Sequence, residues 1–305
     1  MNRIGVEPRP SGLVLLAKPR GLTSFRCLNS VKHKTGRSRV GHAGTLDRFA
    51  SGLLVALVGS YARLNEFVQA GEKIYRGTIS FGEETDTLDP EGEVVASAPP
   101  PDRAALEAAL PFFVGPIKQR PPAYSALHID GKRAYERALA GEAVEMAERP
   151  VTVYALELER FEGGAAVILV RCSAGTYIRS LGRDIALACG SRAHLSELER
   201  LAIGPFSSAD AVDPELFEPE RDIRPLAPED ARRLGLGLCR LGDPDVGRFL
   251  NGGALGGLSF QEWPGAESPQ REGTRAVFDG AGRFLGLVEQ KGEALRYRLV
   301  VGDIA

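Results

Sequence analysis

The sequence has few cysteines and shows no metal-ligand spacing. Its 305 residues include only 4 Cys, 4 His, 2 Met and 1 Trp. The cysteines are far apart in the chain, include no Cys-x-x-Cys pair and have no histidine at ligand spacing: Cys27, Cys172, Cys189 and Cys239. Such a pattern predicts neither a disulfide framework nor a zinc site. We therefore expect four free thiols and no metal.

Long apolar runs are missing as well. No stretch approaches the roughly 18 residues that a membrane helix needs. The apolar run from Leu13 to Ala17 is too short for a signal peptide. We expect no membrane association and a cytoplasmic location. With 43% apolar residues, the chain has enough material for a real core in one large domain, or in a large and a small one.

Charge is nearly balanced overall but unevenly distributed. The net charge is −2, yet residues 1–40 contain nine Lys or Arg against the single acid Glu7, whereas residues 83–107 contain eight acids and one base. A solvated surface accounts for such runs in most proteins. A basic stretch that leads into a glycine-rich segment is also what contact with a phosphate backbone requires.

That glycine-rich segment spans residues 41–54 and begins with Gly41 and His42. It contains three glycines and one carboxylate, Asp47, just before the apolar run from Leu53 to Val58. Glycine is useful where the backbone takes positive φ or where another molecule comes close, so the segment indicates the wall of a pocket. On local chemistry alone, Asp47 can equally well cap a turn through its own backbone.

Residues 41–54 resemble the signature G-H-x-G-T-L-D-P-x-A-T-G-x-L of the TruB-type pseudouridine synthases. Arg48 replaces the usual proline and Ser51 the usual threonine. Three other stretches resemble family motifs in the correct order: residues 18–24, residues 73–92, and residues 172–179 with the family's C-S-x-G-T-Y-I-R pattern. The resemblance covers about residues 12–206, and four ordered motifs are far more specific than any one of them.

The resemblance implies roles for individual residues. Asp47 is implied as the catalytic aspartate, Arg179 as its partner, Tyr75 as the ring that stacks on the target base, and His42 as support for the flipped-out base. From the residues alone, Tyr75 is equally well a core aromatic and Arg179 a solvated charge. Further RNA contacts are expected at Tyr177, Gly44, Thr45, Leu46, Lys18, Arg63, Asp89, Tyr124, Lys132 and Arg133.

Periodicity and the resemblance together predict an α+β fold, with a mixed, mostly antiparallel central sheet flanked by helices and loops. Strands are expected at 12–17, 73–81, 151–158 and 165–172, and a helix that Thr176 caps has Ile178, Leu181, Ile185 and Ala188 as its core stripe. The catalytic domain is expected to span 12–230, with an RNA-pinching thumb at about 118–150 and a linker at 213–230. Residues 235–305, with short strands at 248–253, 276–279 and 283–288, resemble a small PUA-like β domain. We expect a chain that ends near Pro228 to fold without it.

The implied function is isomerisation of uridine to pseudouridine in tRNA, at uridine 55 of the TΨC loop. The reaction adds and removes no group, so no cofactor is expected. Asp47 must be ionised to act as a nucleophile or as a base, and the sequence leaves both roles open. The expected partner is the T-arm of tRNA, bound by a monomer with no obligate protein partner. The alternative is a non-catalytic protein that binds or folds tRNA through the same cleft.

Overall fold

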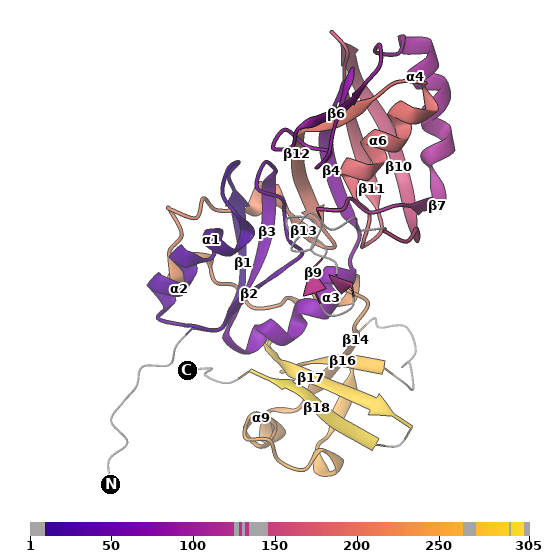
Figure 1. Ribbon diagram of the computed structural model, residues 1–305. Helices are drawn as coiled ribbons and strands as arrows, with labels where there is room; N and C mark the ends of the chain where they lie inside the picture. Colours follow the sequence, from indigo (N-terminus) through magenta and orange to yellow (C-terminus); the bar gives the residue numbers. More distant parts are fainter. Residues whose placement is uncertain are drawn as a thin grey trace.

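The computed structural model describes residues 10–124, 128–129, 132–133, 146–264, 273–292 and 294–301. Most of the expected thumb lies outside these residues; a two-stranded ladder of β8 (His128–Ile129) and β9 (Lys132–Arg133) is described within it, without its side chains. Figure 1 shows a large body built on one sheet and a smaller sheet, in yellow, near the C-terminus. No helix in the described part of the chain is long and apolar enough to span a membrane.

The large sheet has the strand order β1-β3-β12-β4-β11-β10-β7, with β2 paired to β3 and β13 to β12. Only β3 and β12 are parallel neighbours; Glu199 lies opposite Ser51, and Arg200 opposite Gly52. The predicted mixed, mostly antiparallel sheet is therefore confirmed. The bounds of its strands are β1 Gly12–Lys18, β2 Val40–Ala43, β3 Ser51–Val58, β4 Lys73–Phe81, β7 Gly115–Gln119, β10 Arg149–Glu162, β11 Ala165–Cys172, β12 Ala193–Ile203 and β13 Phe206–Ser207.

Two different patterns make these strands. On β4, Tyr75, Ile79 and Phe81 are buried on one face and alternate with partly exposed residues, as the period of two predicts. On β3 the apolar residues run without interruption, because alternate side chains enter two separate cores. Leu53 packs in one core and Leu54 in the other. A strand that is buried on both faces shows no alternation.

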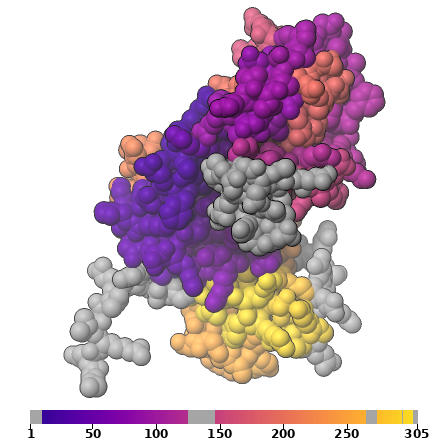
Figure 2. All heavy atoms as spheres, in the orientation of Figure 1, coloured from indigo at the N-terminus to yellow at the C-terminus, as the bar shows by residue number. Residues whose placement is uncertain are grey.

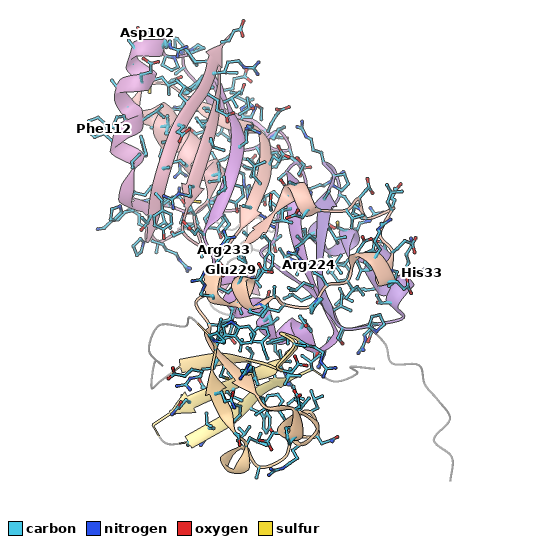
Figure 3. The ribbon with its side chains drawn as sticks, turned by 180° about the vertical axis from the view of Figure 1, so that it is seen from behind. His33, Asp102, Phe112, Arg224, Glu229 and Arg233 are labelled. Atoms are coloured by element: carbon cyan, nitrogen blue, oxygen red, sulfur yellow. The ribbon has the colours of Figure 1, made fainter. Side chains whose placement is uncertain are left out.

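Helices and short 3-10 turns connect the strands: α1 Ser24–Cys27, α2 Asn29–Thr35, η1 Gly59–Leu64, α3 Asn65–Ala70, α4 Arg103–Ala109, η2 Leu110–Phe113, α6 Ile178–Ala188 and η3 Ser208–Asp210. A small ladder joins β5 Glu83–Thr85 and β6 Val94–Ser97. Figure 3 labels Asp102, which caps α4 by accepting from the amide of Ala105 at 2.8 Å. Thr23 and Asp102 accept from backbone amides at the N-caps of α1 and α4, positions where such residues are preferred.

The expected cap of α6 is wrong. The hydroxyl of Thr176 donates to the carbonyl of Ser173 at 3.0 Å, and Tyr177 occupies the cap position without a side-chain bond. A threonine that closes its own preceding turn is not free to cap a helix. Ile178 and Leu181 do face the core, whereas Ala188 is exposed at the last turn.

The stretch from 213 to 230 is not a free linker. It lies along the outer edge of β1, where Leu13 and Arg224 exchange backbone hydrogen bonds of 2.8 and 2.9 Å. The stretch contains the fully buried Phe217. It also contains α7 (Pro219–Asp222) and the start of α8 (Pro228–Arg233). The acidic, proline-dotted composition predicted a linker, but covering a sheet edge satisfies backbone groups that would otherwise stay unpaired.

The small sheet has the strand order β15-β14-β16-β17-β18. Its elements are β14 Gly237–Leu241, α9 Asp243–Leu250, η4 Leu255–Gly257, β15 Phe260–Glu262, β16 Gly273–Phe278, β17 Phe284–Lys291 and β18 Ala294–Val300. Strands at 276–278 and 284–288 are as predicted, but the predicted strand at 248–253 is wrong, since residues up to Leu250 belong to α9. Asp243, Pro244 and Asp245 in its first turn favour a helix start.

The two sheets share one hydrophobic core. Tyr61 and Leu64 of the body belong to the same buried cluster as Phe284 and Leu299 of the small sheet, and the rings of Tyr61 and Phe284 lie 5.5 Å apart, edge to face. In Figure 2 the yellow C-terminal atoms lie directly against the purple atoms of the first hundred residues. Figure 3 shows Glu229 and Arg233, on α8, at this junction.

Removal of residues 235–305 is therefore expected to destabilise the body. The sequence had instead led us to expect that a chain ending near Pro228 folds without these residues. Each large apolar side chain that the cut exposes loses about 1.5–3 kcal/mol of burial, and a typical domain has only about 5–15 kcal/mol to lose. A chain that ends near Pro228 should lose cooperative thermal unfolding or aggregate at low micromolar concentration. A sharp transition within about 5 °C of the full chain, together with a monomeric elution profile, would contradict this.

Candidate active site

The candidate site is built on the loop between β2 and β3, which carries Asp47. Gly44 and Gly52 bound the loop with φ of 78° and 101°, a region that other residues avoid. A Cβ at Gly52 would overlap the backbone of Arg200, because β3 and β12 approach closely there. The glycines predicted from the sequence as pocket-forming are thus required by backbone conformation and by close strand packing.

Two side chains from outside the loop hold its backbone. The hydroxyl of Ser24 donates to the carbonyl of Leu46 at 3.0 Å and accepts from the Leu46 amide at 2.9 Å. The ammonium of Lys18 donates to the carbonyls of Ala50 and Arg48. The residues on each side of Asp47 are therefore fixed before any substrate binds.

Asp47 and Arg179 form a two-point ion pair. Nε of Arg179 lies 2.9 Å from Oδ2 of Asp47, and its Nη2 lies 3.2 Å from Oδ1. The Asp47 side chain is 38% exposed, whereas that of Arg179 is 5% exposed. A buried cation thus holds a partly exposed carboxylate. Parallel bonds of this kind fix the orientation of a carboxylate as well as its charge.

The other bonds of the guanidinium all point inward. Nη1 donates to Oδ2 of Asp89 at 3.0 Å and to the carbonyl of Thr87 at 2.7 Å, and Nη2 donates to the carbonyl of Tyr124 at 2.9 Å. With the two bonds to Asp47, the donors of the planar fork are all used. Arg179 therefore has a single orientation, set by three separate segments of the chain.

Asp89 lies in the turn that completes this arrangement. Its Oδ1 accepts from the hydroxyl of Thr87 at 2.6 Å and from the amide of Glu91 at 3.0 Å. The turn is tight enough to place Leu88 at a φ of 61°, the one positive value outside glycine among the described residues. Asp89 is 5% exposed, so its carboxylate supports Arg179 and does not face solvent.

Burial raises the pKa of Asp47, and the adjacent Arg179 guanidinium opposes that rise, with a smaller lowering contribution from Lys18. Asp89 acts in the opposite sense, since a second carboxylate disfavours the ionised form. Removal of the guanidinium must therefore raise the pKa of Asp47 further. The pair therefore favours the ionised form of an acid whose burial favours the neutral form.

Tyr75 lies on β4, next to this loop. The ring is 8% exposed and packs in the same buried cluster as Leu46 and Phe49 of the loop. Burial raises the pKa of its phenol, while the positive charge of nearby Arg200 acts against that rise. His42, on β2, is half-buried; burial and the nearby Arg200 lower the pKa of its imidazole, so it is neutral at pH 7.

Several expected RNA contacts are not available to a ligand. Lys18 is 1% exposed, and burial lowers its pKa to about 8; it binds backbone carbonyls and has no open face toward a phosphate. Leu46 is 4% exposed and belongs to the core. Asp89 is turned onto Arg179, as described above. In each case the side chain is buried within the protein, where the sequence alone had suggested a contact with RNA.

Arg63 lies elsewhere. Its Nη1 is 3.5 Å from the carbonyl of Arg298, beside a surface hollow of about 390 Å³ at the junction with the small sheet. Thr45 is exposed at the pocket loop, and Tyr177 lies at the start of α6, beside Arg179. The side chains of Lys132 and Arg133 lie outside the described residues. No cluster of three or more His, Cys, Asp or Glu in the described part of the chain is arranged for a metal ion.

Sequence reasoning missed three polar residues that shape the site. Ser24 anchors the loop, and Arg200 donates to the carbonyls of Gly44 and Leu53 at 2.9 Å each. Gln119 exchanges two hydrogen bonds, of 3.0 and 2.8 Å, with the backbone of Tyr177. β12 also carries other polar residues, among them Glu197 and Glu199, so its pattern gave no signal that Arg200 is buried.

Comparison with known proteins identifies the fold. Residues 32–178 match the family described as TruB family pseudouridylate synthase, N-terminal domain. The protein named tRNA pseudouridine synthase B of Treponema pallidum is 36% identical over 360 residues, covering 95% of this chain and 97% of that protein. Its counterpart in Bordetella pertussis is 44% identical over 217 residues, covering 70% and 89%.

Solved structures agree. A chain in the crystal structure of a Cbf5-Nop10-Gar1 complex aligns with a TM-score of 0.67 at 24% identity, covering 99% of this chain and 90% of that one. A chain in the archaeal box H/ACA Nop10-Cbf5 complex aligns with a TM-score of 0.68 at 21% identity, covering 96% and 86%. At these identities the likeness concerns the fold, and it includes the C-terminal sheet. The predicted fold class is confirmed.

Proposed function

This chain belongs to the TruB family of pseudouridylate synthases, and we propose that it acts on tRNA, converting uridine 55 in the TΨC loop to pseudouridine. The chain is an isomerase by family. The observation that supports the site assignment is the two-point pair of the partly exposed Asp47 with the buried Arg179. Binding alone does not require a carboxylate that faces a ligand rich in phosphate.

The proposed reaction breaks the bond from N1 to C1′ of the target uridine, turns the base within the pocket and joins C5 to C1′. The hydrogen at C5 leaves as a proton to solvent, and N1 gains a proton, so atoms balance without a co-reactant. The base must first leave its stack to reach a pocket of this kind. Asp47 acts in its ionised form, either as a nucleophile or as a base at the sugar or at C5.

The other residues have supporting roles in this proposal. Tyr75 stacks on the flipped base, and neutral His42 supports the flipped-out arrangement of the RNA. Asp89 holds the guanidinium of Arg179 in place. RNA contacts are proposed for Thr45, Gly44, Tyr177 and Tyr124, with Lys132 and Arg133 of the thumb. The C-terminal sheet grips a distant part of the tRNA, and the protein acts as a monomer.

The test is tritium release from an unmodified tRNA transcript labelled at C5 of uridine. A matched transcript with cytidine at position 55 and the same label elsewhere is the control. We expect one tritium per tRNA from the first transcript and none from the second. Tight binding of both transcripts without release would favour the non-catalytic tRNA-binding alternative. Equal release from both transcripts would contradict position 55 as the target, but it would not contradict the isomerisation itself.

Replacement of Tyr75 separates stacking from hydroxyl chemistry. Base stacking on an aromatic ring contributes about 1–3 kcal/mol, so Tyr75→Leu should lower the single-turnover rate about 5- to 160-fold. Tyr75→Phe retains the ring and should stay within about tenfold of the original rate. If the Phe variant is as slow as the Leu variant while both unfold at the same temperature, the hydroxyl takes part in the chemistry.

A further inference from the structure

Arg200 is a fully buried cation, 1% exposed, in the middle of the large sheet. It lies on β12 between β3 and β4, and it forms no ion pair with the residues that the structure describes. Its Nε donates to the carbonyl of Leu53 and its Nη2 to the carbonyl of Gly44, each at 2.9 Å. A buried charge is costly without a partner, so these carbonyls are what allows it to remain there.

The two carbonyls stand at the two ends of the loop that carries Asp47. Gly44 precedes Asp47 and has a φ of 78°, and its carbonyl accepts from Arg200 on the neighbouring strand. Leu53 follows it, one residue after Gly52, whose close contact with the Arg200 backbone excludes a side chain. One guanidinium therefore closes the loop at both ends, independently of Ser24, which holds its middle.

Arg200 also lies next to Tyr75 on β4. Arg200 and Tyr75 are direct partners in the antiparallel register of β12 and β4. The positive charge of the Arg200 side chain opposes the rise that burial imposes on the phenol pKa of Tyr75. The Tyr75 ring and the loop that carries Asp47 thus both lie next to the Arg200 side chain.

We propose that Arg200 is a positioning residue, which fixes the loop that carries Asp47 relative to the Tyr75 ring. The planar fork sets both distance and orientation, which an ammonium on a flexible stem does not do. A base stacked on Tyr75 then meets Asp47 at a fixed separation, and small misplacements of reacting groups are costly in rate. This inference rests on the proposed function for its kinetic consequence, but not for its structural one.

The experiment compares Arg200→Met and Arg200→Lys with Lys73→Met as a matched control. Lys73 is also a buried cation on carbonyls, but those carbonyls belong to Gln69 and Gly71 at the end of α3. Arg200→Met should lower kcat at least about 30-fold with KM within about threefold, and Arg200→Lys should recover part of kcat. Lys73→Met should lose thermal stability but retain kcat within about threefold.

Amide hydrogen exchange gives a readout independent of activity. In Arg200→Met, peptides that cover residues 44–53 should exchange at least about tenfold faster, while peptides from the C-terminal sheet stay unchanged. In a Tyr75→Phe background the Arg200→Met loss should be smaller than in the original protein, because the two side chains are coupled.

The outcomes separate the two proposals. If the original protein forms no pseudouridine, the proposed function fails while hydrogen exchange still tests the positioning. Faster exchange in loop and C-terminal sheet alike, with Arg200→Lys no better than Arg200→Met, would mean a general structural role and would overturn the inference. Unchanged loop exchange with kcat within about threefold in Arg200→Met would overturn it as well.

Discussion

Asp47→Asn is expected to abolish isomerisation and to leave tRNA binding within about tenfold. The change removes a charge that acts only in the chemical step, and it keeps the size of the side chain. An amide oxygen can still accept one bond from Arg179, so the guanidinium keeps most of its contacts, including those to Asp89 and the carbonyls. Because the Asp47 side chain is 38% exposed, the loss of stability should be small.

The measurement is single-turnover tritium release at saturating enzyme, with filter binding of the same transcript. Asp102→Asn is the control, since it makes the same chemical change at the cap of α4, away from the site. Mass spectrometry must exclude deamidation of the new asparagine back to aspartate. A rate above about 1% of the original enzyme in a deamidation-free sample would remove Asp47 from the chemical step.

The sequence predicted the loop of Asp47 but not how the loop is held. Glycine positions and the isolated acid follow from local backbone chemistry, so Gly44, Gly52 and Asp47 were within reach. Ser24 and Arg200 act over distances of 22 and 156 residues along the chain, and no local pattern reports such contacts. The strand of Arg200 also carries His194, Ser196, Glu197 and Glu199, so its local pattern did not single out the arginine as buried.

The errors have a common physical origin. Lys18 and Asp89 were expected to contact RNA, yet both are buried and satisfied by the protein itself. Segment 213–230 has the composition of a linker, yet it covers a sheet edge. In each case the tertiary partners, which the sequence does not display, changed the role that composition indicated.

The second prediction concerns Arg179, whose replacement should alter both the rate and its pH dependence. Arg179→Lys keeps one positive charge but cannot make two parallel bonds to Asp47 while contacting Asp89 and two carbonyls. We expect a rate loss of at least about 100-fold at pH 7, with tRNA affinity within about tenfold, because a misplaced carboxylate costs about that much.

The pH profile shows whether the guanidinium acts through Asp47. Only the ionised carboxylate is active, so the rate falls as pH drops through the pKa of Asp47. Burial already raises that pKa and Arg179 opposes the rise. Weakening the pair must raise the pKa further, and the acid limb of the rate profile should therefore move to higher pH in Arg179→Lys, with partial recovery of rate in alkaline buffer.

Arg179→Ala supplies the limiting case and a test of stability. It leaves Asp89 buried without its cation, and breaking a buried pair in this way costs about 3–5 kcal/mol. The double variant Arg179→Ala/Asp89→Asn should regain part of that stability without regaining activity, since Asp47 still has no partner. Recovery of activity in the double variant, or an acid limb that does not move in Arg179→Lys, would mean that the guanidinium acts on the RNA and not on the carboxylate.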